Sequence, residues 1–182
     1  MRRTSLFAGA VLAGTLAASA QAEGFRLTSS TIAEGVQMGE DQVFAGFGCT
    51  GGNRSPQLSW SGAPEGTRSF ALTAYDPDAP TGSGWWHWAV VNIPVSVGGL
   101  DEGASGTAAM PAGAVEMTND FGVTSFGGAC PPPGEVHRYV FTLYALPVDR
   151  LDLPEGASNA LAGFMINGST LGSARITAVY TR

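Results

Sequence analysis

Short apolar runs, each bounded by glycine, proline or small polar residues, recur along the chain from about residue 25 to its end. They are rich in valine, phenylalanine, tyrosine, threonine and isoleucine, and sustained helical periodicity is nearly absent, which is typical of all-β proteins. Several runs are apolar on both faces and therefore predict strands deep inside a packed sandwich. The candidate strands are Phe25–Ser29, Gln57–Ser61, Ser69–Tyr75, His87–Ile93, His137–Leu146 and Arg175–Thr181.

One segment near the C-terminus predicts a helix. Ser158 is suited to cap its N-terminus, Leu161 and Met165 would share a face, and Asn167-Gly168 would end it. Residues 97–113 are small and lack periodicity, which predicts a long surface loop. With no internal repeat and no linker, the pattern predicts one antiparallel β-sandwich domain over residues 23–182, with one or two short helices.

Residues 1–22 differ from the rest of the chain and predict a secretory signal peptide. Arg2 and Arg3 form a basic start, Leu6–Leu16 an apolar run and Ala20-Gln21-Ala22 a small-residue cleavage site. No other apolar stretch approaches the roughly 20 residues of a membrane-spanning helix. We therefore expect an exported protein, periplasmic or secreted, without a membrane span; an uncleaved N-terminal anchor is the alternative.

The charge balance narrows the range of partners. The full chain has a net charge of −6 and contains no lysine, and removal of residues 1–22 leaves seven arginines against 15 acids. An acidic surface disfavours nucleic acids and anionic membranes, whose phosphates require a basic patch. Any anionic ligand must therefore be bound by a local site that acts against the overall field.

Cys49 and Cys130 are the only cysteines. An exported chain with two thiols has one pairing available, and an oxidising compartment favours it. Two free, buried thiols are the alternative, because the sequence alone does not show whether the two Cα atoms lie within bonding reach.

Polar side chains stand at the ends of three apolar rows. Alternation places Phe70, Leu72, Ala74 and Asp76 on one face, His87 with Ala89, Val91 and Ile93, and His137 and Tyr139 above Phe141 and Leu143. If the three rows face one core, Asp76, His87, His137 and Tyr139 meet at its open end. Trp85 and Trp86 lie in the turn before His87, where an indole would form an apolar wall with one donor.

The set of Asp76, His87 and His137 admits three functional interpretations. Two imidazoles and a carboxylate can bind a metal ion, perform general acid–base hydrolysis, or bind an oxyanion while Asp76 orients a histidine. The structural alternative is that Asp76 caps a turn and both histidines are satisfied wall residues. The glycine-rich Gly46–Gly51 is followed by Pro56 rather than a helix, so it predicts no dinucleotide cofactor.

Several ordered motifs together resemble a known family. They are Cys49-Thr50-Gly51-Gly52-Asn53-Arg54-Ser55-Pro56-Gln57-Leu58-Ser59-Trp60, Asp76-Pro77-Asp78-Ala79-Pro80, His87-Trp88-Ala89-Val90-Val91-Asn92-Ile93-Pro94, and Gly127-Gly128-Ala129-Cys130-Pro131-Pro132-Pro133-Gly134 followed by His137-Arg138-Tyr139. In these motifs the chain resembles the phosphatidylethanolamine-binding protein family, in particular the exported members of its bacterial Raf-kinase-inhibitor-like branch. The resemblance runs from about Phe25 to Tyr180.

The resemblance implies a Greek-key β-sandwich with a small pocket that accepts phosphate, phosphorylated head groups or acetate-like anions. The matching pocket positions are Asp76, Trp85, His87, Gly128, Pro132, His137 and Tyr139. It also implies a binding or regulatory protein, of a kind that inhibits kinases or proteases, without a settled enzymatic activity, and by analogy with bacterial relatives a homodimer. We expect no metal and no cofactor. The chain stops after Arg182, without the C-terminal helix that covers the pocket in the eukaryotic branch.

We therefore expect a non-enzymatic, exported protein that binds a small phosphate-like anion. His87, His137, Tyr139 and loop amides would donate hydrogen bonds to the anion, and binding would strengthen as the pH falls through about 6.5. The alternatives are an inhibitor module whose pocket receives a side chain of a protein partner, and a metal-dependent hydrolase.

Overall fold

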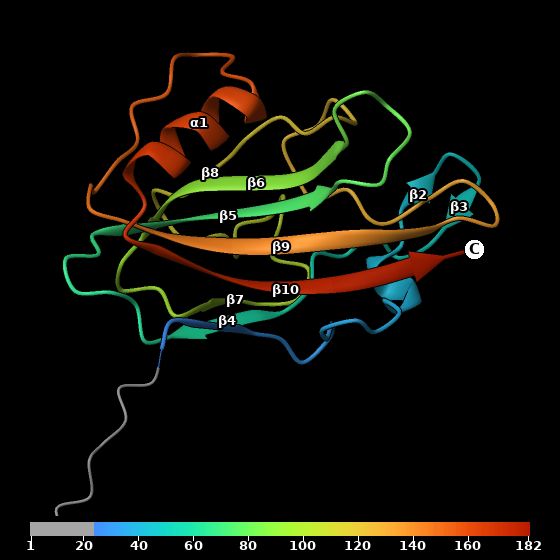
Figure 1. The fold of residues 1–182 in the computed structure, drawn as a ribbon, viewed down its shortest axis with the longest axis horizontal. Helices are drawn as coiled ribbons and strands as arrows, with labels where there is room; N and C mark the ends of the chain where they lie inside the picture. The colour runs from blue at the N-terminus through green and yellow to red at the C-terminus, as the bar shows by residue number, and fades with distance from the viewer. Residues whose placement is uncertain (1–23) are drawn as a thin grey trace, which may run out of the picture.

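The computed structural model describes residues 24–182, so the predicted signal peptide at residues 1–22 lies outside the described residues. The strands form a five-stranded sheet of order β10-β9-β5-β6-β8, a three-stranded sheet of order β1-β4-β7 and a β2-β3 hairpin (Figure 1). The strands are β1 Arg26–Thr28, β2 Ala45–Gly46, β3 Cys49–Thr50, β4 Leu58–Ser61, β5 Ser69–Asp76, β6 Trp85–Pro94, β7 Gly99–Leu100, β8 Val115–Glu116, β9 Val136–Leu146 and β10 Gly172–Thr181; the helices are the 3₁₀ turn η1 Glu40–Gln42 and α1 Asn159–Ser169.

The strands β5 and β6 of the five-stranded sheet are buried on both faces, whereas β9 and β10 alternate between buried and more exposed residues. On one face Leu72 and Phe141 join Leu58 of the three-stranded sheet in the main core. On the other face Ala71 packs in a second cluster with Ile166 of α1, which lies over the sheet in Figure 1. This double burial explains why the central strands are apolar at successive positions. The expected antiparallel β-sandwich is confirmed.

All six predicted strands are present, with shifted ends. β5 extends to Asp76 and β6 begins at Trp85, so the polar residues lie in the strands themselves. Four strands of two residues each, β2, β3, β7 and β8, were not predicted, because two residues leave no periodic pattern. The expected loop at residues 97–113 contains β7, and Leu100 within it is buried in the main core.

The predicted helix forms, but its buried face differs from the expected one. Ser158 Oγ accepts a hydrogen bond from the amide of Leu161, as an N-cap does. The buried residues include Ala162 and Ile166, whereas Leu161 is 38% exposed. The helix also passes through Gly168 to Ser169. A nearly uniformly apolar helix has no strong preferred face, so packing against the sheet sets its rotation.

Candidate functional site

The ends of β5, β6 and β9 meet at one end of the five-stranded sheet, on the right in Figure 1. Asp76 is the last residue of β5, Trp85 the first of β6, and His137 the second of β9. A cavity of about 190 Å³ opens there. Its lining consists of Phe47, Asp76, Ala79, Pro80, Thr81, Trp85, His87, Phe121, Cys130, Pro131, Pro132, His137 and Tyr139. Every predicted ligand-binding residue except Gly128 therefore lines one cavity.

His87 reaches this cavity through a β-bulge, which the sequence analysis did not foresee. Strict alternation predicted a single row of His87, Ala89, Val91 and Ile93. Instead Ala89 and Val91 pack on the α1 side, whereas Ile93 packs in the main core. Ala74 pairs with Trp88 and Tyr75 with Trp86, so His87 is an extra residue in β6. Such an insertion re-aims a side chain and interrupts the alternation of faces.

A second irregularity in β6 accounts for the position of Ile93. The register shifts between the pairs Phe70–Ile93 and Leu72–Val90. Asn92 has a φ of 59°, in the left-handed region. The two bulges together explain why the row expected on β6 does not exist, while the rows on β5 and β9 form as predicted.

Asp76 is buried, and both of its carboxylate oxygens are occupied. Oδ1 accepts hydrogen bonds from the amides of Asp78 (2.8 Å) and Ala79 (3.0 Å), which closes the Asp-Pro-Asp turn. Oδ2 accepts a hydrogen bond from Nδ1 of His137 at 2.7 Å. This geometry matches the expectation that Asp76 orients a histidine.

His137 lies between two carboxylates. Its Nε2 is 2.9 Å from Oε2 of Glu135, opposite the Nδ1 contact with Asp76. Burial alone would lower the pKa of His137, but the hydrogen bonds to Glu135 and Asp76 outweigh burial and raise that pKa above its ordinary value. Because carboxylates only accept hydrogen bonds, the positively charged form of the ring, which donates from both nitrogens, satisfies both contacts.

His87 has the opposite electrostatic character. Its Nδ1 lies 2.7 Å from the carbonyl oxygen of Gly127. A carbonyl only accepts, so Nδ1 must carry the proton. Burial lowers the pKa of His87 despite this contact, so the ring is neutral near pH 7 and Nε2 is an acceptor. The expectation that His87 donates to an anion therefore requires protonation of the ring.

Tyr139 and Trp85 line the cavity, and each carries a buried donor without an acceptor among the described residues. Among the described residues, the Tyr139 hydroxyl and the Trp85 Nε1 are two of four buried side-chain polar atoms that have no hydrogen-bond partner. Burial raises the pKa of Tyr139, so its hydroxyl keeps its proton. An indole N–H can only donate. Both donors therefore lack an acceptor among the described residues. Buried polar groups are usually hydrogen-bonded, so two such donors indicate a place where a bound molecule supplies the acceptor.

The loop before β9 contributes fewer donors than expected. The amide of Gly127 donates to the carbonyl of His87, that of Gly128 to Oδ1 of Asn53, and that of Ala129 to the carbonyl of Gln42. Gly128 does not line the cavity, so the geometry gives no support to its expected ligand contact. A Cβ on Gly128 would lie 2.4 Å from the Gln42 carbonyl oxygen, so glycine permits close backbone packing there.

The predicted disulfide forms and ties the cavity wall to a hairpin. Cys49 of β3 is bonded to Cys130 of the loop, with their Cα atoms 6.0 Å apart. Arg182 joins the same two segments, because its side chain donates to the carbonyls of Pro131 (2.6 Å) and Phe47 (3.4 Å). The wall on this side is therefore held by one covalent and two polar links.

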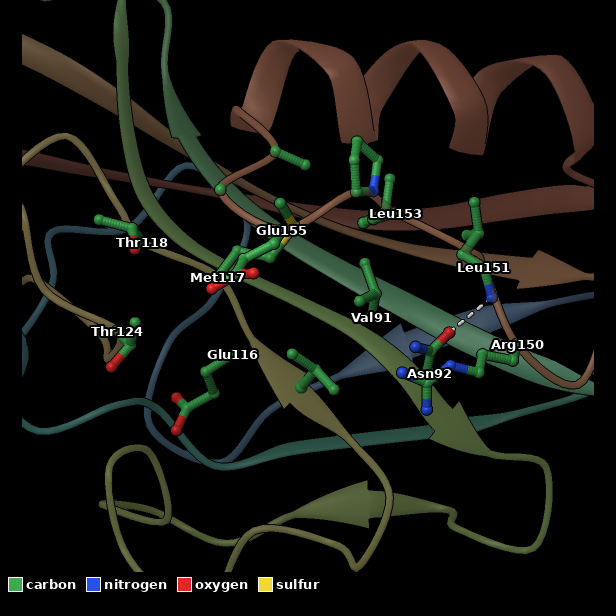
Figure 2. A pocket seen from close by; sticks show the side chains of 14 residues that line it. Val91, Asn92, Glu116, Met117, Thr118, Thr124, Arg150, Leu151, Leu153 and Glu155 are labelled. Atoms are coloured by element: carbon green, nitrogen blue, oxygen red, sulfur yellow. Dashed lines mark hydrogen bonds between the residues drawn. The ribbon is translucent and has the colours of Figure 1, made fainter.

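A second cavity, of about 250 Å³, lies at the edge of the sheet where β6 pairs with β8 (Figure 2). Asn92 Oδ1 accepts there from the amide of Leu151 at 2.7 Å. The Glu116 carboxylate is occupied by the Trp88 indole and the amide of Gly106. This cavity contains neither a predicted site residue nor a buried donor without a partner, so the smaller cavity is the stronger candidate site.

The sequence did not predict the aromatic residues Phe47 and Phe121 at this site, or the contact of Glu135 with His137. Phe47 and Phe121 line the cavity, and their rings lie 5.8 Å apart. Glu135 precedes His137 by two positions, so strand alternation could have identified it. No local signal pointed to the two phenylalanines. Within residues 24–182, no three His, Cys, Asp or Glu residues are grouped so as to hold a metal ion.

The two histidines predict opposite pH dependences of stability. Below about pH 6.5, His87 is protonated in the unfolded chain but stays neutral in the native chain until the pH reaches the lowered pKa of the native ring. Stability therefore falls as the pH falls through this range. The stabilisation from His137 is fully present below about pH 6.5 and is lost as the pH rises through its raised pKa. We expect maximal free energy of unfolding near pH 6.5, measured by urea denaturation.

Single variants separate the two contributions. His87→Gln should flatten the acidic side of this profile, and His137→Gln the alkaline side. Asp78, whose pKa the Arg138 side chain lowers to about 2, acts only at more acidic pH. A profile that rises or falls steadily between about pH 5 and 8 would contradict the assignment.

Comparison with known proteins identifies close relatives. The family model for phosphatidylethanolamine-binding protein matches residues 28–181. The chain is 53% identical to Escherichia coli YbcL over 165 residues (89% of this chain, 90% of YbcL) and 49% identical to E. coli YbhB over 157 residues (86% and 99%).

The crystal structure of YbcL, described as a new member of the mammalian PEBP family, superposes with a TM-score of 0.85 at 51% identity and covers 88% of this chain and 99% of that one. A more distant relative, Mycobacterium tuberculosis LppC, is 38% identical over 135 residues (74% of this chain, 63% of LppC), and its name includes the word lipoprotein.

Proposed function

Because the chain belongs to the phosphatidylethanolamine-binding protein family, we propose that its cavity binds a small oxyanion, phosphate or a phosphorylated head group, without catalysis. The observation that carries the proposal is one cavity whose lining includes His137 and two residues, Trp85 and Tyr139, that each carry a buried donor without an acceptor among the described residues. Donors that lack acceptors beside a cation are complementary to an anion.

The size and the acid–base character of the cavity refine the ligand. A volume of about 190 Å³ suits a single head group rather than a large molecule. His87 offers an acceptor nitrogen while it is neutral, so it pairs with a protonated oxygen of the ligand or takes up a proton on binding. Binding should therefore strengthen as the pH falls, most at values where His87 becomes protonated.

Removal of the Tyr139 hydroxyl tests the proposal with little risk to the fold. We expect Tyr139→Phe to weaken binding of inorganic phosphate about tenfold or more, because a hydrogen bond to a charged group is lost. Unfolding stability should change little, because no acceptor among the described residues takes the proton of this hydroxyl, although its oxygen interacts with the backbone amide of Cys130. Isothermal titration calorimetry measures the affinity, and urea denaturation the stability.

Tyr180→Phe is the matched control. Its hydroxyl donates to Glu40 at 3.2 Å and does not line the cavity, so phosphate affinity should stay at the wild-type value. If wild type and Tyr139→Phe bind phosphate with equal affinity, the hydroxyl of Tyr139 does not contact the ligand. Sulfate, which does not titrate near neutral pH, separates protonation of the protein from that of the ligand.

A side chain of a protein partner is the second candidate occupant. Phe47 lines the cavity and is nevertheless 71% exposed, so it offers an apolar contact at the mouth. An acidic or phosphorylated side chain could then enter while the partner covers Phe47. Capture of one defined protein by wild type but not by His87→Ala would favour this inhibitor-like role.

Export is part of the proposal. The basic and apolar segments of residues 1–22 support it. The Cys49–Cys130 disulfide is typical of oxidising compartments. No helix in residues 24–182 is long and apolar enough to cross a membrane. The homodimer implied by the resemblance stays a prediction.

A further inference from the structure

Both ring nitrogens of His137 are already occupied by carboxylates. Nδ1 contacts Asp76 at 2.7 Å and Nε2 contacts Glu135 at 2.9 Å. A ligand that takes a hydrogen bond from His137 must therefore replace one of these two partners. The two carboxylates differ greatly in how readily they can leave.

Asp76 is fixed in place. Its carboxylate is 4% exposed, and the amides of Asp78 and Ala79 hold its second oxygen. Glu135 is free to move by comparison, since its side chain is 50% exposed and, within residues 24–182, its carboxylate makes no hydrogen bond besides the one to His137. Gly134, with a φ of 83°, precedes it in the loop. Glu135 is thus the replaceable partner.

The charges around His137 make simultaneous occupancy unfavourable. Asp76 comes from β5, Asp78 from the following turn, and Glu135 from the loop before β9. Arg138 is engaged by Asp78 through two side-chain contacts, of 2.9 and 2.7 Å, and Tyr180 of β10 pairs in register with His137. An anion at Nε2 would add a further negative charge next to Glu135, and like charges at contact distance repel.

We propose that Glu135 is a built-in competitor for the ligand, whose carboxylate occupies Nε2 of His137 until an oxyanion displaces it. This inference rests on the proposed oxyanion function of the cavity. Without a ligand, Glu135 together with Asp76 keeps both nitrogens of His137 hydrogen-bonded. A ligand must interact with Nε2 more favourably than Glu135 does in order to displace it. Glu135 is thereby a determinant of affinity, although it is absent from the cavity lining.

The test compares Glu135→Gln with a matched charge change far from the site. Calorimetry with inorganic phosphate at pH 7 should give an affinity roughly three- to tenfold higher for Glu135→Gln than for wild type, because an exposed carboxylate partner is lost. Glu135→Ala should bind at least as tightly. Glu65→Gln removes the same charge in the turn between β4 and β5, away from the cavity lining, and should leave the affinity unchanged.

A second readout separates competition from a general charge effect. The pKa of His137, followed by NMR, should fall toward its ordinary value in Glu135→Gln, because one of the two partners that raise it is gone. Phosphate binding to wild type with no gain in Glu135→Gln would overturn the competitor and leave the oxyanion site standing. Binding by Glu135→Gln alone would support the competitor strongly. Failure of both proteins to bind would overturn the oxyanion function and the competitor with it.

Discussion

Asp76→Ala is expected to lower the free energy of unfolding by about 3–5 kcal/mol, the usual effect of removing one partner of a buried charged pair. The substitution leaves His137 buried without its Nδ1 partner, and it deprives the amides of Asp78 and Ala79 of their acceptor. Unsatisfied buried groups each destabilise by roughly 1–3 kcal/mol. Urea denaturation near pH 6.5 measures the change.

Two further variants test whether burial, rather than charge alone, causes the expected loss of stability. Asp76→Asn retains an acceptor oxygen for the two amides, so it should destabilise less than Asp76→Ala. Asp78→Ala breaks the ion pair with Arg138, whose side chain is 57% exposed, and should destabilise by about 1 kcal/mol at most. If Asp76→Ala and Asp78→Ala destabilise equally, Asp76 does not act as the buried anchor of the site.

Loss of the disulfide is the second large effect. The Cys49→Ala/Cys130→Ala double variant is expected to unfold with about 2–4 kcal/mol less free energy than wild type, since the bridge restricts a long loop of the unfolded chain. The two cysteines are 81 positions apart. Urea denaturation of wild type with and without dithiothreitol, beside the double variant, measures the contribution.

The reductant supplies the control for this experiment. Dithiothreitol should destabilise wild type to about the level of the double variant and leave the double variant unchanged. Because Cys130 lines the cavity, phosphate affinity should also fall when the bridge is absent. A wild type that is indifferent to reductant under unfolding conditions would show that the bridge contributes nothing to stability.

The site residues could be predicted from strand alternation to different degrees. On β9 the rule placed His137 and Tyr139 correctly above Phe141, and on β5 it placed Asp76 beyond Leu72. On β6 the rule failed, although His87 does line the cavity. The cause is the pair of bulges, which the sequence marks only by residues that many strands also contain.

The sequence predicted that Asp76 orients a histidine, but it could not predict that the pKa values of the two histidines shift in opposite directions. Both histidines have the same intrinsic pKa, yet burial lowers that of His87, whereas Glu135 and Asp76 raise that of His137. Which partner each ring nitrogen meets depends on contacts between segments far apart in the chain. The same holds for the amide of Gly128, which was expected to face the ligand and is taken by Asn53.

The amino-acid sequence by itself determined the antiparallel β-sandwich class and most of the polar residues at the strand ends. It could do so because period-two hydrophobicity and turn residues are local properties of the chain. Only the tertiary structure decided the aim of His87, the rotation of α1, the protonation of the imidazoles and the contact of Glu135 with His137. Those features arise from packing and electrostatics among residues that approach one another only after the chain has folded.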